Sequence, residues 1–297
     1  MTNSTKIIAE AGVNHNGSLS MALELVDIAA AAGADYVKFQ TFKAKNLANI
    51  NAKKAPYQTR TTNQNESQFD MLSRLELSID DHFEIQKRCV DKGINFLSTP
   101  FDLDSLSLLT KHFNLSEIKL GSGELTNGPL LLAAGQARVK IILSTGMGTL
   151  AEVEQALGVI AFGMCRKGSP KGRTDFANVL VEKEIWPILS EQVTLMHCTT
   201  DYPAAAEETN LKAMNTLRQA FGLKVGYSDH TSGEVISLAA VALGANVIEK
   251  HFTLDRSLPG PDHAASLEPK ELNSLVQNIR IVESAIGSGI KQPSPTE

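Results

Sequence analysis

The chain has 297 residues, of which 42% are hydrophobic and 21% charged, and its formal net charge is −5. An acidic balance argues against general nucleic-acid binding, which needs a basic face, although a few local lysines could still hold a small anionic substrate. The N-terminus does not look like a leader, and no apolar run reaches the ~18–20 residues of a membrane span. Three widely separated cysteines provide neither a disulfide framework nor a CxxC site, so we expect reduced thiols in a cytoplasmic protein.

Short β-rich segments alternate with segments of helical period along the whole chain. The β-rich segments are residues 6–13, 36–42, 95–101, 117–123, 139–146, 192–200, 224–231 and 247–254. The amphipathic segments are residues 18–32, 81–92, 150–162, 211–221, 234–243 and 269–286. This alternation indicates parallel strands joined by right-handed crossovers, and eight repeats favour a closed (β/α)₈ TIM barrel over residues 1–287. An open doubly wound sheet is the alternative, but the first turn lacks a GxGxxG fingerprint.

Two longer segments interrupt the alternation. Residues 43–78 are long and polar, and a loop of that length inside a compact domain is usually functional or mobile. Residues 164–190 form a second insertion with a basic start, which we interpret as a solvated loop. Residues 288–297 are typical of a linker.

Polar side chains follow the apolar body of every predicted strand. Such residues have no packing reason to stand at strand ends, and the carboxyl ends of barrel strands form the active site in this architecture. An isolated lysine or histidine in a strand more often has a structural role than a role in binding a substrate or a metal. The convergence of eight polar sets on one rim is what favours a catalytic site.

The residue types at this rim suggest three kinds of chemistry. Lys38 and Lys119 could supply positive charge to a phosphate or carboxylate, and hydroxyls and backbone N–H groups could complete the anion cradle, from Thr99, Ser122 and Ser144.

His230 and His251 end adjacent strands and could share one divalent ion, of which Mn²⁺, Mg²⁺, Zn²⁺ and Co²⁺ are all compatible. The spacing matches no zinc motif, so the chemistry alone leaves metal binding open. The remaining carboxylates are candidates for acid–base work or for accepting sugar hydroxyls, namely Glu10, Glu124, Glu249 and Asp262.

Eight motifs occur in order: IIAEAGVNHNG, YVKFQTFKA, FLSTPFD, IKLGSGELTN, ILSTGM, HCTTDYP, VGYSDHT and VIEKHFTLD. Together they resemble the bacterial sialic acid synthase family, also called nonulosonate synthases, over residues 6–297. The resemblance implies that phosphoenolpyruvate condenses with an open-chain N-acetylated mannosamine-type sugar. C3 of phosphoenolpyruvate attacks the aldehyde, water adds to C2, and phosphate leaves by C–O cleavage.

The resemblance also implies roles for individual residues. Phosphoenolpyruvate would contact Lys38, Thr99, Lys119, Ser122 and Ser144, and the acceptor and phosphate region would be completed by Gln40 and Tyr202. His230 and His251 would hold the divalent ion, with Mn²⁺ expected and Mg²⁺ or Co²⁺ as alternatives. The sugar or the reacting water would contact Glu10, Glu249 and Asp262, and Glu124 would be a further carboxylate of the site.

Two departures from the family pattern bear on function. Members usually continue past this linker into an antifreeze-like domain, which contributes an arginine to the partner's sugar site in a homodimer. Thr200 stands where some members have asparagine, which favours 2,4-diacetamido-2,4,6-trideoxymannose, giving legionaminate, over N-acetylmannosamine, giving N-acetylneuraminate.

Two other functions stay open at this stage. A barrel that binds phosphoenolpyruvate or a sugar phosphate without turnover is the main alternative. A Schiff-base aldolase that uses Lys38, Lys119 or Lys250 is a weaker one, because the two histidines offer a metal instead.

Overall fold

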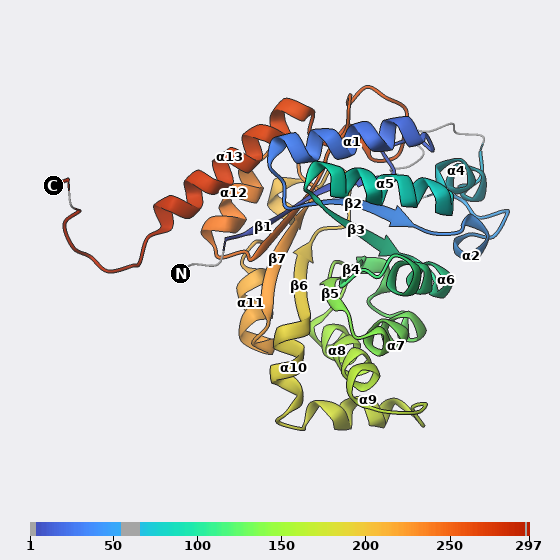
Figure 1. Ribbon diagram of the computed structural model, residues 1–297. Coiled ribbons are helices and arrows are strands. Elements are labelled where there is room, and N and C mark those ends of the chain that lie inside the picture. Colours follow the sequence, from blue (N-terminus) through green and yellow to red (C-terminus); the bar gives the residue numbers. More distant parts are fainter. Residues whose placement is uncertain (1–3, 55–65, 295) are drawn as a thin grey trace.

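Eight parallel strands surrounded by helices make up the computed structural model, which describes residues 4–54, 66–294 and 296–297 (Figure 1). The strands are β1 (Lys6–Gly12), β2 (Tyr36–Thr41), β3 (Asn95–Pro100), β4 (Glu117–Leu120), β5 (Lys140–Ser144), β6 (Val193–Cys198), β7 (Lys224–Asp229) and β8 (Val247–His251). Their order, β3-β2-β1-β8-β7-β6-β5-β4, confirms the TIM barrel. β3 and β4 lie side by side at the ends of this order, although no residues of the described chain pair between them as a ladder.

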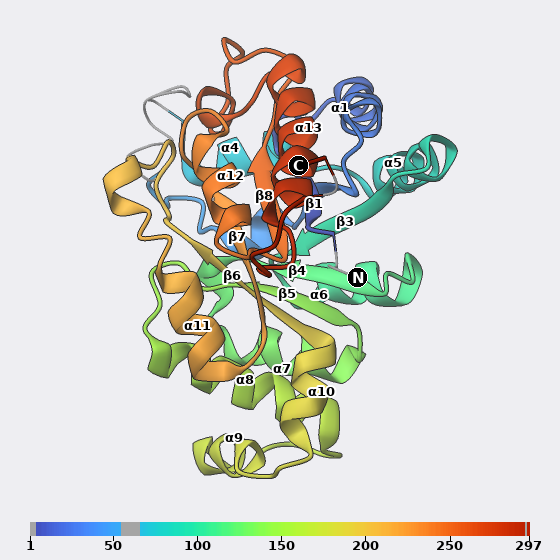
Figure 2. The same ribbon diagram turned by 90° about the vertical axis from the view of Figure 1, so that its left-hand side faces the viewer.

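Helices follow most strands and cover the outside of the barrel, as the second view shows (Figure 2). The α-helices are α1 (Leu19–Ala32), α2 (Ala44–Leu47), α4 (Gln68–Leu75), α5 (Ile79–Lys92), α6 (Leu103–Ser107), α7 (Gly128–Ala137), α8 (Leu150–Cys165), α9 (Arg173–Leu180), α10 (Ile185–Gln192), α11 (Ala213–Phe221), α12 (Val235–Ala242) and α13 (Pro269–Ile286). Short turns add a π-helix, η1 (Leu108–His112), and the 3₁₀ segments η2 (Ser122–Glu124), η3 (Ala206–Glu208) and η4 (His263–Ala265). No described helix is long and apolar enough to cross a bilayer.

Local sequence signals explain where the helices begin and end. The Ser78 hydroxyl and the Asp81 carboxylate form a capping box at the start of α5, which satisfies backbone N–H groups that have no partner within the helix. Gly33 after α1 and Gly244 after α12 have φ values of 80° and 85°, a left-handed conformation that glycine adopts at little cost. The chain therefore leaves α1 and α12 with the same local geometry before it enters β2 and β8.

The two long insertions are more ordered than the sequence suggested. α2 and α4 lie within the segment 43–78, of which residues 55–65 fall outside the described residues. The segment 164–190 is not simply a solvated loop, because it contains α9 and most of α10, and Val179 and Ile185 are buried against α8 and its neighbours. Short amphipathic stretches in a polar context have a weak helical signal, because most of their stability comes from tertiary packing.

The barrel interior has a small apolar layer below the carboxyl ends of the strands. Its buried members are Ile8, Leu97, Ile142, Met196 and Val247. Side chains two positions apart on a strand share a face. The residue two positions after each member therefore also points inward, one step closer to the rim: Glu10, Thr99, Ser144, Cys198 and Glu249. The strand period thus places a polar layer directly above an apolar one.

Candidate active site

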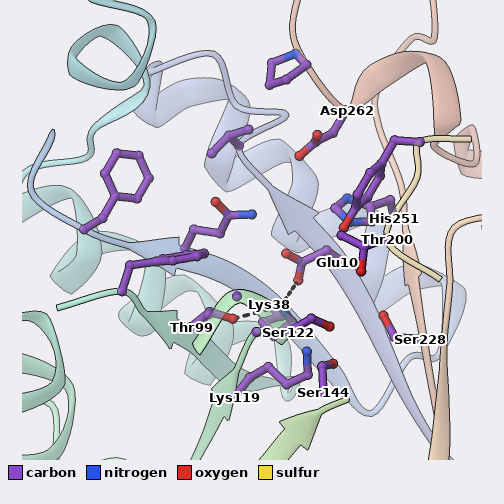
Figure 3. A pocket seen from close by; sticks show the side chains of 18 of the residues that line it. Glu10, Lys38, Thr99, Lys119, Ser122, Ser144, Thr200, Ser228, His251 and Asp262 are labelled. Carbon is purple, nitrogen blue, oxygen red and sulfur yellow. Dashed lines mark hydrogen bonds and ion pairs between the residues drawn. The ribbon is translucent and has the colours of Figure 1, made fainter. Parts of the chain in front are cut away.

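A cavity of about 330 Å³ opens at the carboxyl ends of the strands. Its polar lining includes every residue that the sequence analysis selected for the site except Glu124: Glu10, Lys38, Gln40, Thr99, Lys119, Ser122, Ser144, Tyr202, His230, Glu249, His251 and Asp262. Side chains from β1, β2, β3, β4, β5 and β8 converge there (Figure 3). Residues far apart in the sequence therefore meet in one volume.

A buried ionic network forms the floor of this cavity. Lys38 Nζ lies 2.7 Å from Glu10 Oε2 and 3.6 Å from Glu249 Oε2, while Lys119 Nζ lies 3.2 Å from Glu249 Oε1. Lys38 Nζ also donates to Thr99 Oγ1 at 3.0 Å (Figure 3). Ser228 Oγ donates to Glu249 Oε1 at 2.9 Å. Two lysines and two carboxylates thus balance one another before any substrate binds.

The network gives its two carboxyl groups opposite proton affinities. Burial raises the pKa of Glu10 to about 7, because the ammonium groups of Lys38 and Lys119 offset burial only in part and the neighbouring Glu249 carboxylate raises the pKa further. Burial also acts on Glu249, but Lys119 and Lys38 together bring its pKa below the ordinary value. Glu10 can therefore exchange a proton near neutral pH, whereas Glu249 stays ionised and holds the lysines in place.

The two predicted imidazole ligands lie together beside Tyr202. The ring centroids of His230 and His251 are 5.7 Å apart, and the Tyr202 ring lies 4.2 Å from that of His230 and 5.6 Å from that of His251. Burial lowers the pKa of His230 to about 4 and the pKa of His251 well below its ordinary value. Both rings are therefore neutral at pH 7 and keep the lone pair that a metal ion requires.

The hydrogen bonds of the two rings fit a divalent ion. His230 Nδ1 donates to Thr199 O at 2.6 Å, which leaves the lone pair on Nε2, and this arrangement is typical of metal-bound histidine. His251 Nδ1 is buried and has no hydrogen-bond partner among the described residues. No group of three or more His, Cys, Asp or Glu side chains that could hold an ion occurs in the described part of the chain. The protein would thus supply two imidazoles and leave the other positions open.

Other polar groups of the cavity remain available to ligands. The Ser144 hydroxyl is buried and unpaired within the described structure, which suits an anion that approaches Lys119. Burial raises the pKa of Asp262 to about 6. Gln40 also lines the cavity.

Glu124 lies outside this set. The chain leaves β4 at Leu120 and turns through η2, and Glu124 Oε2 there accepts a hydrogen bond of 2.6 Å from Asn127 Nδ2. Glu124 is not among the residues that line the cavity. The structure therefore assigns it a contact at the start of α7 rather than a place beside the other carboxylates.

Several lining residues were not selected from the sequence. Ser228 and Cys198 point inward because they stand two positions after Gly226 and Met196, so strict strand alternation could have identified them. An apolar wall on the α4 side could not be identified in this way, because its residues come from separate segments: Phe42, Leu47, Met71, Leu72, Leu75 and Phe101.

Lys250 is separated from the cavity by the strand itself. Its neighbour Glu249 points inward, whereas Lys250 Nζ pairs with Asp229 Oδ2 at 3.1 Å and donates to Thr231 O on the outer face. Lys250 is absent from the cavity lining. It therefore supports the turn that carries His230 and cannot serve as a Schiff-base residue in this cavity.

A (β/α)₈ barrel whose rim joins a lysine-rich anion cradle to a pair of neutral histidines defines a class of enzyme that acts on small anionic substrates. Residues 25–291 match the NeuB family, and the chain belongs to that family.

The chain is similar to two curated relatives with the same name. It is 52% identical to the N,N'-diacetyllegionaminic acid synthase of Campylobacter jejuni, over 99% of this chain and 80% of the relative. It is 45% identical to the N,N'-diacetyllegionaminic acid synthase of Legionella pneumophila, over 98% of this chain and 76% of the relative. Among solved structures, N-acetylneuraminic acid synthetase from Leptospira borgpetersenii, in complex with citrate, aligns with a TM-score of 0.79 and 32% identity. That alignment covers 99% of this chain and 89% of the other.

Proposed function

We propose that this chain is a nonulosonate synthase that joins phosphoenolpyruvate to 2,4-diacetamido-2,4,6-trideoxymannose, with N-acetylmannosamine as the alternative acceptor. The observation that carries the proposal is the buried network of Glu10, Lys38, Glu249 and Lys119 at the cavity floor. Two ammonium groups beside hydroxyl donors suit a substrate with a phosphate and a carboxylate. The choice of acceptor follows the names of the two curated relatives.

The reaction needs a group that can both give and accept a proton. When C3 of phosphoenolpyruvate attacks the aldehyde carbon, the aldehyde oxygen gains negative charge and takes a proton. Water then adds to C2 and loses a proton, and the C–O bond to phosphate breaks to give the 2-keto acid. Glu10, with its pKa near 7, suits both transfers because it can protonate the alkoxide and then be reprotonated by the water.

The remaining residues bind and orient the substrates. Lys38 and Lys119 would hold the anionic groups of phosphoenolpyruvate, aided by the hydroxyls of Thr99, Ser122 and Ser144. His230 and His251 would hold a divalent ion, expected to be Mn²⁺, with Mg²⁺ or Co²⁺ as alternatives, which supplies Lewis acidity toward the acceptor aldehyde. Gln40, Tyr202 and Asp262 would contact the acceptor. A homodimer is part of the proposal, on the family resemblance alone.

The proposal is tested by incubating the protein with phosphoenolpyruvate, Mn²⁺ and each aldehyde sugar in turn. Release of phosphate together with a nine-carbon 2-keto acid is the expected result. If neither sugar gives product while calorimetry still detects binding of phosphoenolpyruvate, the protein is a barrel that binds this substrate without turnover. Trapping of a covalent adduct with borohydride would instead indicate a Schiff-base aldolase.

Replacing Lys119 with alanine is expected to raise the KM for phosphoenolpyruvate. Loss of one charge-assisted contact costs about 1.5–3 kcal/mol, which corresponds to about a 10- to 150-fold change. Steady-state kinetics with phosphoenolpyruvate varied at saturating acceptor measure the effect. Lys140→Ala is the matched control, because Lys140 is exposed at the opposite end of the neighbouring strand β5. An unchanged KM in Lys119→Ala would remove Lys119 from the anion cradle.

A further inference from the structure

Cys198 holds a position in the cavity wall that the proposed chemistry does not use. It is the last residue of β6, is buried, and lines the cavity. Its sulfur lies 3.1 Å from Ser122 Oγ, and Ser122 is its only hydrogen-bond partner within the described residues. The contact joins the end of β6 to the η2 turn after β4.

The Ser122 hydroxyl has a second neighbour on its other side. Gly146 N donates to Ser122 Oγ at 3.1 Å. The position of Gly146 is fixed because Thr145, just before it, donates to Met196 O from both its backbone N and its Oγ1, at 2.9 and 3.0 Å. Gly146 N and Cys198 Sγ thus approach Ser122 Oγ from the ends of β5 and β6.

The close approach requires glycine at position 146. A Cβ atom there would lie 2.5 Å from Thr200 Oγ1 and 2.8 Å from both Cys198 Sγ and Ser122 Oγ. These distances are too short for real contacts. The absence of a side chain at Gly146 therefore lets the thiol and the two hydroxyls gather around its backbone.

A hydroxyl group has one proton to donate and two lone pairs that accept. Gly146 N–H occupies one lone pair of Ser122 Oγ. A thiol is both a weak acceptor and a weak donor, and the distance alone allows either atom to donate. The Ser122 O–H is the stronger donor and gains more from a charged acceptor in the cavity than from the sulfur, and in that arrangement the Cys198 S–H donates to the second lone pair. With both lone pairs occupied, the Ser122 proton must point elsewhere, and Ser122 borders the cavity.

We infer that Cys198 is a positioning residue that keeps the Ser122 hydroxyl as a hydrogen-bond donor toward an anionic group in the cavity. The inference rests on the proposed function, which places the phosphate or carboxylate of phosphoenolpyruvate on this side. The ordered Ser122 hydroxyl would be a further group that favours binding of an anion in the cavity. A hydroxyl held as a donor stabilises negative charge, and a freely rotating one must first be ordered.

The test compares Cys198→Ala, Cys198→Ser and the wild-type protein, with Cys165→Ala as the matched control at the partly exposed end of α8. In Cys198→Ala we expect the dissociation constant for phosphoenolpyruvate, measured by calorimetry, to rise about threefold to tenfold, the usual worth of one hydrogen bond. Affinity for inorganic phosphate should fall in parallel, and the KM for the acceptor sugar should not change. Cys198→Ser should restore wild-type affinity, because its O–H can donate to Ser122. Cys165→Ala should match the wild type.

Three outcomes would contradict the inference. Wild-type affinity in Cys198→Ala would show that the thiol does not orient Ser122. Equal losses in Cys198→Ala and Cys198→Ser would point to packing of the sulfur instead of its proton. If the wild-type protein binds no phosphoenolpyruvate, the proposed function fails and the inference fails with it. The first two outcomes overturn the inference while leaving the proposed function intact.

Discussion

Replacing Glu249 with leucine is expected to lower the free energy of unfolding by about 3–5 kcal/mol, because it removes one partner of a buried ionic network. Glu249 is the ion-pair partner of Lys119 and a second partner of Lys38, and the side chains of all three are at most 5% exposed. Without Glu249, Lys119 has no carboxylate partner among the described residues. Urea denaturation at pH 7 measures the loss.

Two further variants make this prediction specific. Glu182→Leu is the matched control, because Glu182 pairs with Arg166 at the surface, where both side chains are about 40% exposed. Such surface pairs contribute only about 0.2–1 kcal/mol. Adding Lys119→Met to Glu249→Leu should recover part of the stability, because the unpaired charge is removed as well. A loss below about 1 kcal/mol in Glu249→Leu alone would mean that water in the cavity already solvates Lys119.

Replacing His251 with alanine is expected to abolish turnover that depends on a divalent ion, by at least two orders of magnitude, while leaving the fold intact. The removed ring has a buried Nδ1 without a hydrogen-bond partner among the residues that the structure describes, and its centroid lies 5.7 Å from that of His230. Loss of one of the two imidazole ligands should lower the affinity for the ion more than loss of a residue that only hydrogen-bonds to a ligand. Loss of such an outer residue already lowers metal affinity or activity about 10- to 100-fold. Mn²⁺ binding, followed by calorimetry or electron paramagnetic resonance, is measured beside kcat.

The control for this variant is His112→Ala. His112 is an exposed histidine at the end of η1 and does not line the cavity. The His112→Ala variant should have the Mn²⁺ affinity and the kcat of the wild-type protein. Full activity of the wild-type protein in excess EDTA, or unaltered Mn²⁺ binding in His251→Ala, would exclude the proposed ion site.

The strand pattern predicted the barrel and most of the candidate site. Apolar residues alternate along each strand, and a polar residue at an inward position near the strand end interrupts the pattern, which is visible in the local sequence. In a parallel barrel all strands end at the same rim, so all of these polar residues lie there. Glu10 after Ile8 and Glu249 after Val247 illustrate this, because each follows a buried apolar residue by two positions. The lysine–carboxylate pairs themselves could not be predicted, because they depend on which strands become neighbours after closure.

The structure differs from the sequence-based prediction in two places, each for a physical reason. The segment 117–123 was expected to be one strand, but the backbone leaves β4 at Leu120, and Glu124 consequently reaches Asn127. The segments 43–78 and 164–190 contain short helices that pack against the barrel. Their patterns extend over only two or three turns, and contacts with distant residues decide their structure.

The cavity combines parts with different tolerance of change. Its ionic floor is built on strand residues that stand directly above the apolar layer, so a substitution there affects fold and chemistry together. Most of its apolar wall comes from α2 and α4, which lie on the long insertion between β2 and β3. Phe42 and Phe101, directly after β2 and β3, complete it. Substitutions in the wall can therefore change the shape of the cavity without disturbing the ionic floor.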